Sequence, residues 1–382
     1  MARDPPLHET SQGREVRIAH TESSVNLGGQ ELRVLEHVRW LNEHGHHSWL
    51  LAPPGTVVWR EAECRGIPLV PVRFRGSFNP SAVAALARFV RRHRVDLIDC
   101  HSTWDAATAM VMRLFGCRIV RSQHIGKHLR NDVFHRLLWR YGCDRIIAVS
   151  EGIASHIVAQ GLAGREKIDV VWSCIDLSRF RPDIDGTPVR DMFGIPHGAK
   201  LIVQVGMIRP DKGQHHLVHA VDRIVAEVPE AWFLLVGSPT RPEYLEGLKA
   251  EIAQVRHGGR IVLAGFRRDV ENCLAAADVV VIASEMEGRT QVVPQAFAMR
   301  KPVVASAAGG TPEMVEDGQT GFLFPVGDTD RLARAVVRAV SAPAETDRVV
   351  EKAYAMALER FGTDVMMQMT LETYRTVLGR SR

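Results

Sequence analysis

Short apolar runs alternate with helix-length segments almost to the end of this 382-residue chain. The runs are continuous and rich in Val, Ile and Leu, which is typical of strands that are buried on both faces. Such strands form parallel sheets with helices on both sides, because each parallel pair needs a long crossover connection. We therefore predict an α/β fold of doubly wound parallel sheets. The predicted strands are residues 16–20, 48–52, 67–72, 96–101, 118–122, 145–150, 169–173, 201–206, 232–237, 261–265, 279–284 and 302–306.

A segment rich in proline, glycine and charge, residues 179–200, interrupts this alternation. It carries no apolar core, so we interpret it as a linker, and the chain is long enough for two domains. We predict a disordered leader at 1–15, a first Rossmann-like domain at 16–190 and a second at 191–350. The residues from 351 to 382 have helical periodicity, and we expect them to pack on the first domain.

The composition favours a globular protein, with 46% hydrophobic and 24% charged residues. No apolar run approaches the length of a membrane span, roughly 18 residues, and residues 1–15 do not resemble a secretory signal. We expect a cytoplasmic location. The six cysteines show neither a CxxC pair nor zinc-ligand spacing, so we interpret them as free thiols and predict no metal site.

Basic residues gather between Arg113 and Arg145, where eight Lys and Arg residues accompany two acidic ones. One interpretation is a set of solvated helix faces. The other is a surface for an anionic acceptor or for acidic lipid headgroups, which would give a peripheral contact with the cytoplasmic membrane. We expect no nucleic-acid binding, because the charges do not alternate with stacking aromatic residues.

Two cations follow the predicted strand at 201–206. The strand ends at Gly206, and Arg209 and Lys212 lie three residues apart before the next helix. Ligands of open α/β sheets bind beyond the carboxyl ends of the strands. Arg offers phosphate oxygens a planar fork and Lys a point charge. We predict that both bind a diphosphate, the alternative being two solvated loop charges.

An acidic residue, Glu287, follows the predicted strand at 279–284. A carboxylate at this place is suited to accept hydrogen bonds from sugar hydroxyls, although an exposed loop acid would give the same pattern. Gln295 lies eight residues later. Its sequence context alone indicates a glutamine on a helix surface.

The first half of the chain places polar residues at strand ends. His101 and His124 end two predicted strands, and we expect at least one of them to contact substrate. Asp105 would orient an acceptor hydroxyl or cap the helix that follows. Gly28 and Gly29 precede a helix, where they would bring the backbone close to a diphosphate or form an ordinary turn. The GxGxxG spacing is missing there, which disfavours a dinucleotide cofactor.

Five motifs of the second half occur in the order found in family 4 glycosyltransferases, which this chain resembles. They are GMIRPDKGQHHLVHA, FLLVGSP, IVLAGFRRDVENCLAAADVVVIAS, EGRTQVVPQAFAMRKPVVAS and AGGTPEMVEDGQTGFLFPVGD. The first half is similar more loosely, through NLGGQELRV, DLIDCHSTWD and RIIAVSEGI. Its HSTWD and RSQH segments resemble a bacterial branch that acts on lipopolysaccharide and related surface glycans. The resemblance implies a GT-B fold, in which two Rossmann-like domains face each other across a cleft. It also implies a nucleotide-sugar donor, a retained anomeric configuration and no metal or cofactor.

The resemblance implies a set of site residues as well. His124 would lie near the reacting centre, with His101 and Asp105 on the acceptor side. Lys212, Arg209 and Glu287 would carry the chemistry at the donor. The donor-binding residues would be Gly28, Gly29, Gly206, Arg209, Lys212, Glu287, Gly288, Arg289, Thr290, Gln291 and Gln295.

The chain departs from the family pattern at three places. Gln295 stands where the family has the second of two glutamates. If that pair were a hydrolase-like acid and base, Gln295 would stop the chemistry, whereas a residue that only holds ribose hydroxyls needs just an oxygen acceptor. Met207 stands at the usual position of an arginine, which Arg209 would replace, and Ser173-Cys174 replaces Asn-Gly. We expect an active hexosyl- or glycosyltransferase; the alternatives are an inactive nucleotide-sugar binding protein and, less favoured by the motif order, a UDP-sugar epimerase.

Overall fold

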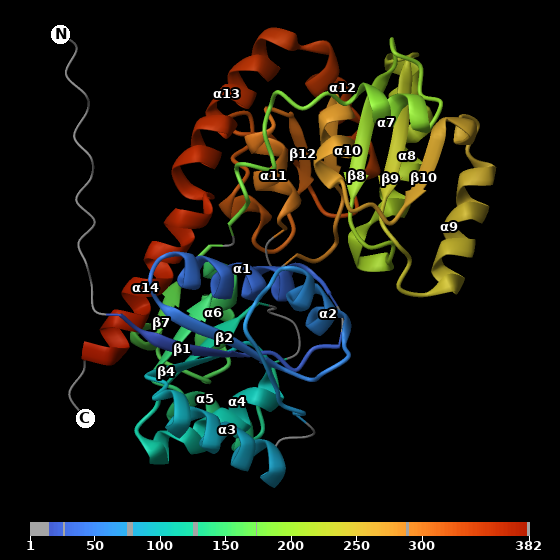
Figure 1. Ribbon diagram of the computed structural model, residues 1–382. Coiled ribbons are helices and arrows are strands. Elements are labelled where there is room, and N and C mark those ends of the chain that lie inside the picture. The colour runs from blue at the N-terminus through green and yellow to red at the C-terminus, as the bar shows by residue number, and fades with distance from the viewer. Residues whose placement is uncertain are drawn as a thin grey trace, which may run out of the picture. The chain divides into compact units, whose positions relative to one another are not determined.

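The computed structural model describes residues 15–25, 27–74, 79–124, 129–172, 174–287 and 290–379. The chain divides into two compact units (Figure 1). One comprises Met1–Ser122, Asp132–Ile146 and Tyr374–Arg382, and the other comprises Gln123–Asn131 and Ile147–Thr373. Among the described helices, none combines the length and the apolar character that a membrane span requires.

The first sheet has seven strands in the order β3-β2-β1-β4-β5-β6-β7. The pairs β2–β3, β1–β2, β1–β4 and β4–β5 are parallel. The strand order reverses between β1 and β4, which makes the carboxyl ends of these two strands the place where open α/β sheets bind ligands. The strands are β1 Arg17–Thr21, β2 His47–Ala52, β3 Leu69–Pro71, β4 Leu97–Cys100, β5 Arg118–Gln123, β6 Arg145–Ala148 and β7 Ile168–Val170.

Helices cover both faces of this sheet. Figure 1 shows α1 and α2 on one face and α3, α4 and α5 on the other, as right-handed crossovers from a central β1 require. The helices and 3₁₀ turns of this part are α1 Gly29–Glu43, α2 Val57–Cys64, α3 Pro80–His93, α4 Thr103–Met110, η1 Val111–Phe115, α5 Val133–Tyr141, α6 Glu151–Ala159 and η2 Arg165–Lys167.

The second sheet has six strands in the order β10-β9-β8-β11-β12-β13, and its order reverses between β8 and β11. The strands are β8 Lys200–Val205, β9 Ala231–Val236, β10 Ile261–Gly265, β11 Val279–Ile282, β12 Val303–Ser306 and β13 Phe322–Phe324. The helices and 3₁₀ turns are α7 Thr187–Met192, η3 Pro210–Lys212, α8 Gln214–Glu227, α9 Pro242–Gln254, η4 Gly258–Arg260, α10 Val270–Ala276, α11 Val292–Ala298, η5 Thr311–Glu313, α12 Thr329–Ser341, α13 Pro343–Arg360 and α14 Thr363–Gly379.

Both faces of the second sheet are packed, as its continuous apolar runs predict. In β11, Val280 and Ile282 belong to the hydrophobic cluster on one face. Val279 and Val281 belong to the cluster on the other face, because successive side chains of a strand point in opposite directions. Each such fully buried side chain contributes about 1.5–3 kcal/mol through its removal from water. The sheet is therefore a rigid base for the turns at its carboxyl edge.

The predicted α/β fold of two parallel-sheet domains is confirmed, and every predicted run overlaps an observed strand. We did not predict β13, because three residues are too few to give a periodic pattern. After β12 the chain forms only the single 3₁₀ turn η5, Thr311–Glu313. The six cysteines form no disulfide bond among the described residues; Cys64 is exposed and the other five are buried.

Candidate functional site

Two turns that are far apart in the sequence meet at the carboxyl edge of the second sheet. One follows β8 and ends at Lys212, and the other follows β11 and contains Glu287. They are neighbours because β8 and β11 are adjacent where the strand order reverses. Lys212 Nζ donates a hydrogen bond to Glu287 Oε1. The predicted diphosphate-binding cation and the predicted sugar-binding carboxylate are thus in direct contact.

The backbone around Glu287 is fixed by a close approach of the turn after β12. Gly309 has a φ of +52°, and a Cβ atom there would lie 1.7 Å from the Glu287 carbonyl oxygen. Only glycine fits this position. Gly310 N donates to the same carbonyl at 3.4 Å, and Ser284 Oγ donates to the Glu287 carboxylate at 2.8 Å. The turn after β12 therefore fixes the backbone of Glu287, and Ser284 fixes its carboxylate.

The turn that carries Lys212 is held in a similar way. Gly213 has a φ of +65°, and a Cβ atom there would lie 1.9 Å from the carbonyl oxygen of Ala283 at the end of β11. From β8, Gln204 Nε2 donates to the Lys212 carbonyl at 2.7 Å. The lysine backbone is thus tied to both of the strands that border the switch point.

Arg209, the other predicted phosphate ligand, has a different partner. Its Nε lies 3.0 Å from Asp211 Oδ1, and both side chains are partly exposed. Such a pair is screened by water and contributes little to stability. Gly206 directly follows β8, as predicted. The structure places Arg209 and Lys212 in one turn, but only Lys212 contacts Glu287.

The remaining predicted donor residues surround the start of α11. Thr290 is buried, and its Oγ1 accepts a hydrogen bond from Val292 N at 3.2 Å. Gln291 is the residue that precedes the helix. Gln295 is half-buried within it, and its backbone N donates to the Gln291 carbonyl at 3.2 Å. The predicted donor-binding residues Gly288 and Arg289 lie outside the described residues.

Two buried glutamines at this edge were not predicted. Gln204 lies on β8 and Gln214 begins α8; both donate through Nε2, to the carbonyls of Lys212 and Met207. The Oε1 atom of each is buried and has no hydrogen-bond partner among the described residues. A buried acceptor without a partner is costly and rare. The sequence signal was weak, namely one amide inside the apolar run LIVQVG.

A histidine pair on α8 faces the turn after β11. His216 Nε2 lies 2.9 Å and His215 Nε2 3.4 Å from Glu285 Oε1. His215 Nδ1 is also 3.2 Å from the Tyr244 hydroxyl. Burial lowers the pKa of His215 and raises the pKa of Tyr244 to about 12. One ligand atom each of His215, His216 and Glu285 lie within 4.8 Å of one another, which is close enough to hold a divalent cation. The histidine nitrogens, however, already have protein partners.

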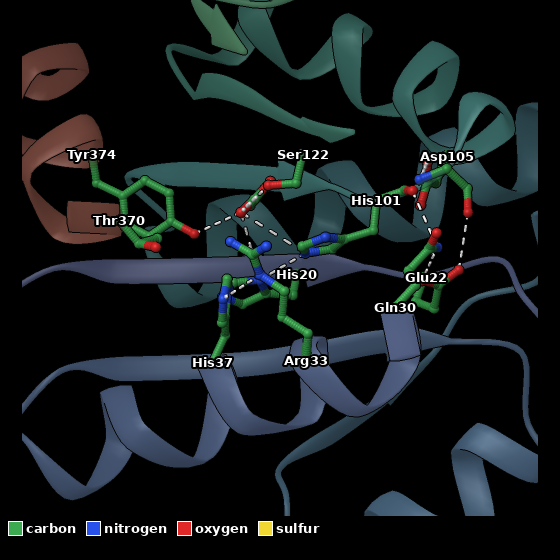
Figure 2. A network of polar contacts seen from close by, with 12 residues as sticks. His20, Glu22, Gln30, Arg33, His37, His101, Asp105, Ser122, Thr370 and Tyr374 are labelled. Carbon is green, nitrogen blue, oxygen red and sulfur yellow. Dashed lines mark hydrogen bonds and ion pairs between the residues drawn. The ribbon is translucent and has the colours of Figure 1, made fainter. Parts of the chain in front are cut away.

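The switch point of the first sheet holds a buried polar network, which Figure 2 shows. His20 is on β1 and His101 follows β4. His20 Nδ1 and His101 Nε2 are 3.0 Å apart, and the two rings are stacked with an interplanar angle of 15°. Burial lowers the pKa of His20 to about 3, so its imidazole is neutral. The side chain of His101 is thus buried and contacts another residue of the same sheet, His20.

Asp99, on β4, is the buried acid of this network. Its Oδ1 accepts a hydrogen bond from Ser122 Oγ at 2.8 Å, and its Oδ2 accepts one from the Tyr374 hydroxyl at 2.6 Å. Burial raises the pKa of Asp99 to about 7, although these bonds and the charge of Arg33 act in the opposite direction. Arg33 Nε also lies 3.3 Å from His37 Nε2. The guanidinium thus brings a positive charge close to the buried acid.

A second part of the network joins the turns after β1 and β4. Glu22 accepts hydrogen bonds from Ser102 Oγ at 2.9 Å and from Gln30 Nε2 at 2.7 Å. Asp105 Oδ1 accepts one from Ser102 N at 3.0 Å and so caps α4. Burial raises the pKa of both carboxyls, that of Asp105 well above its ordinary value. Of the two roles considered for Asp105, the structure shows the cap, while acceptor binding by His101 and Asp105 stays a prediction.

The other predicted residues of the first part lie at element ends. Gly28 precedes α1, and its N donates to Glu31 Oε2 at 2.7 Å. Gly29 is the first residue of that helix. His124 directly follows β5 and is half-buried. Their predicted contacts with donor and reacting centre remain predictions.

The two doubly wound parallel-sheet domains agree with a GT-B fold, and glycosyltransferases of known structure superpose on the chain. A glycosyltransferase from Rickettsia africae superposes with a TM-score of 0.88 and 19% identity, over 97% of this chain and 100% of that one. Anabaena HepE in complex with UDP gives a TM-score of 0.84 and 23% identity, over 94% of this chain and 100% of that one. These likenesses establish the fold and confirm that prediction.

Residues 27–179 match the family model described as Glycosyltransferase Family 4, and residues 199–342 match the model described as Glycosyl transferases group 1. Together the two matched ranges span most of the chain, which is thus similar to glycosyltransferase domains in both of its halves. A D-inositol 3-phosphate glycosyltransferase of Nocardioides sp. is 31% identical over 70% of this chain and 64% of its own length. An N-acetyl-alpha-D-glucosaminyl L-malate synthase of Bacillus anthracis is 24% identical over 79% of this chain and 80% of its own length. The chain therefore spans less than two thirds of the first of these relatives.

Proposed function

We propose that this protein is a retaining glycosyltransferase that moves a hexosyl or related sugar from a nucleotide-sugar donor to a glycan or lipid-linked acceptor. The observation that carries the proposal is the contact between Lys212 and Glu287 at the switch point of the second sheet. The cation can bind the diphosphate of a sugar nucleotide, and the carboxylate on the adjacent turn can accept hydrogen bonds from its sugar hydroxyls. The match of both domains to glycosyltransferase families supports the same proposal.

Lys212 would change partners when the donor binds. In the structure its ammonium group donates to Glu287; in the complex it would donate to an oxygen of the diphosphate. There it stabilises the negative charge that develops as the bond to the sugar breaks. Glu287 would then accept hydrogen bonds from sugar hydroxyls. Arg209 would add its charge only after it leaves Asp211.

Retention of configuration follows if the acceptor attacks the face from which the diphosphate departs. An oxygen of the leaving diphosphate would take the acceptor proton on that same face, so the reaction needs no separate base. His124 would lie near the reacting centre, and neither metal nor cofactor would take part, because Lys212 supplies the charge. Gln295 would accept hydrogen bonds from the ribose hydroxyls through its amide oxygen.

The acceptor class is the finer part of the proposal. The two relatives are named for D-inositol 3-phosphate and L-malate, which are small and soluble compounds. The HSTWD and RSQH segments resemble instead the branch that acts on lipopolysaccharide and surface glycans. We propose a surface-glycan or lipid-linked acceptor, made at the cytoplasmic side. If the protein transfers sugar to a small hydroxy acid or a polyol phosphate and not to such a glycan, the proposed acceptor class is wrong, while the proposed glycosyltransferase activity stands.

Thermal shifts with a panel of nucleotide sugars, recorded in the presence of a chelator, test the donor site. A ligand that binds only the folded state raises the melting temperature according to its affinity. We expect a shift with one nucleotide class, lost in Lys212→Ala and kept in Lys249→Ala, a control lysine on α9 that is half exposed. No shift with any donor would contradict the proposal. Binding without transfer and without donor hydrolysis would instead favour the inactive binding protein.

A further inference from the structure

The helix α5, Val133–Tyr141, exposes apolar side chains to solvent. Val133, Leu137 and Tyr141 are 75%, 51% and 62% exposed. They are spaced four residues apart and therefore form one stripe along the helix. Phe134 is exposed beside them. The helix packs on its own unit through the opposite face, which consists of His135, Leu138 and Trp139.

A second exposed apolar group lies on η1. Leu114 is the most exposed large hydrophobic residue of the described chain, at 84%, and Phe115 next to it is also exposed. Phe115 lines a surface hollow together with Arg88 and Arg91 of α3. Isolated exposed hydrophobic residues are ordinary, but a group of them marks an interaction surface.

These groups belong to one layer of the first unit. The helix α4 contacts α3, η1 and α5, and α3 also contacts η1. Figure 1 shows α3, α4 and α5 on the same face of the first sheet. We call this surface the α5–η1 face and define it by Leu114, Phe115, Val133, Phe134, Leu137 and Tyr141.

The charge around the α5–η1 face is positive. Arg136 and Arg140 are exposed on α5, and Arg88, Arg91 and Arg92 are exposed on α3. The acidic residues of the region have partners: Asp144 lies 2.8 Å from Arg113 and 3.4 Å from Arg118, and Asp132 caps α5. Exposed arginines close to an apolar stripe are typical of surfaces that lie on lipid headgroups.

We propose that the α5–η1 face binds the surface of an anionic phospholipid bilayer. The apolar side chains enter the boundary between headgroups and acyl chains, and the arginines donate to lipid phosphates. The complementary charges select an anionic bilayer over a neutral one. The inference goes beyond the donor-site chemistry and does not depend on it, because none of its residues belongs to the second sheet.

Flotation with vesicles tests the proposal on the full-length protein. We expect the protein to float with vesicles of phosphatidylcholine and phosphatidylglycerol, to float less with phosphatidylcholine alone, and to be released by salt. Leu137→Asp should lower the partition coefficient by about tenfold or more, since it removes an inserted side chain and adds a negative charge. Leu358→Asp, a leucine of α13 that is 48% exposed, should bind as the wild type does.

A charge-matched pair tests the arginines. The double substitution Arg136→Glu with Arg140→Glu should weaken binding to the anionic vesicles by about tenfold or more. The same double change at the exposed residues Arg334 and Arg348 should leave binding nearly unchanged. Thermal unfolding of each variant shows whether it is folded.

Three results would overturn the proposal. One is a wild-type protein that stays with the soluble fraction at low salt. Another is equal weakening by the α5 substitutions and by their controls, which would mean that net charge alone drives binding. The third is a dimer in solution that Leu137→Asp makes monomeric, which would identify the face as a contact between copies of this chain. Donor binding is read separately from the thermal shifts, so failure here leaves the donor proposal intact.

Discussion

Tyr374 donates a hydrogen bond of 2.6 Å to Asp99 across 275 positions of the sequence. Both residues are buried. A buried carboxyl group is costly unless its oxygens have partners, and Asp99 has one such partner on α14 and another, Ser122, on β5. The last helix therefore completes a network whose other members come from the first third of the chain.

Replacement of Tyr374 by Phe should destabilise the protein. The change removes the donor to Asp99 Oδ2 and keeps the ring in place. We expect a loss of about 1–3 kcal/mol of unfolding free energy, the typical effect of leaving a buried acceptor without its partner, measured by urea denaturation. Tyr354→Phe, on the half-buried tyrosine of α13, is the matched control. Equal stability of the two variants would refute the role assigned to the hydroxyl.

The titration of Asp99 should make stability depend on pH. Burial raises the pKa of Asp99 from 3.8 to about 7. Between these two pH values the folded chain therefore holds a proton that the unfolded chain has released. The stabilising contribution is complete at the acid end and declines as pH rises through about 7. His20, with a pKa lowered from 6.5 to about 3, acts in the opposite sense, losing its contribution as pH falls.

The variant Asp99→Asn should separate these two groups. The variant has no carboxyl group that titrates at position 99. Between about pH 4 and about pH 7 its free energy of unfolding should therefore decline less than that of the wild type, or rise more. Urea unfolding in a series of buffers measures the two profiles. Parallel profiles would show that Asp99 has the same pKa in the folded and unfolded states.

Substitution of Lys212 by Ala should reduce turnover. If its ammonium group stabilises the leaving diphosphate, its loss should lower kcat by about 10²–10³-fold, as the removal of one transition-state donor does. Arg241→Ala, an exposed cation before α9, should retain kcat. Near-normal turnover of Lys212→Ala in a steady-state transfer assay would rule the assignment out.

Gly309→Ala should disturb the site without unfolding the chain. Its Cβ atom would lie 1.7 Å from the Glu287 carbonyl at a φ of +52°, so the turn that carries Glu287 has to shift. We expect weakened donor binding by thermal shift or calorimetry. Gly247→Ala is the matched control, because a Cβ atom there meets nothing within 4 Å. Unchanged donor affinity in Gly309→Ala would show that this close approach does not position the carboxylate.

The role proposed for Gln295 can be tested by two exchanges. Gln295→Glu keeps an oxygen acceptor and should retain activity. Gln295→Leu removes the acceptor and should weaken nucleotide binding by about tenfold, the effect of one lost hydrogen bond. Calorimetric titration with the free nucleotide measures both variants. An unchanged affinity of the leucine variant would exclude the ribose contact.

The fold was predictable because its strands are continuous apolar runs, for which burial on both faces is the only favourable state. β11, with its sequence VVVI, is an example. The three residues of β13 gave no such signal. Lys212 and Glu287 were each predicted from their position after a strand. Their contact depends on the adjacency of β8 and β11, which no local pattern encodes.

The buried polar residues were the least predictable part of the site. Asp99 and Gln204 each interrupt an apolar run, and the sequence does not indicate which distant group will satisfy them. Asp105 had two possible roles from its spacing alone, and only the position of Ser102 N shows it as a cap. The partner of Asp99 lies near the other end of the chain, beyond the reach of any local rule.

The position of Tyr374 has a consequence for the order in which the protein matures on the ribosome. The first compact unit includes residues Tyr374–Arg382, so a nascent chain that already contains all strands of the first sheet still lacks the donor for Asp99. Domains generally fold as units in the order of synthesis, but this unit reaches its final packing only after Tyr374 has been synthesised. A ribosome stalled before codon 374 would hold a chain that contains every strand of the second sheet but whose first unit still lacks this hydrogen bond.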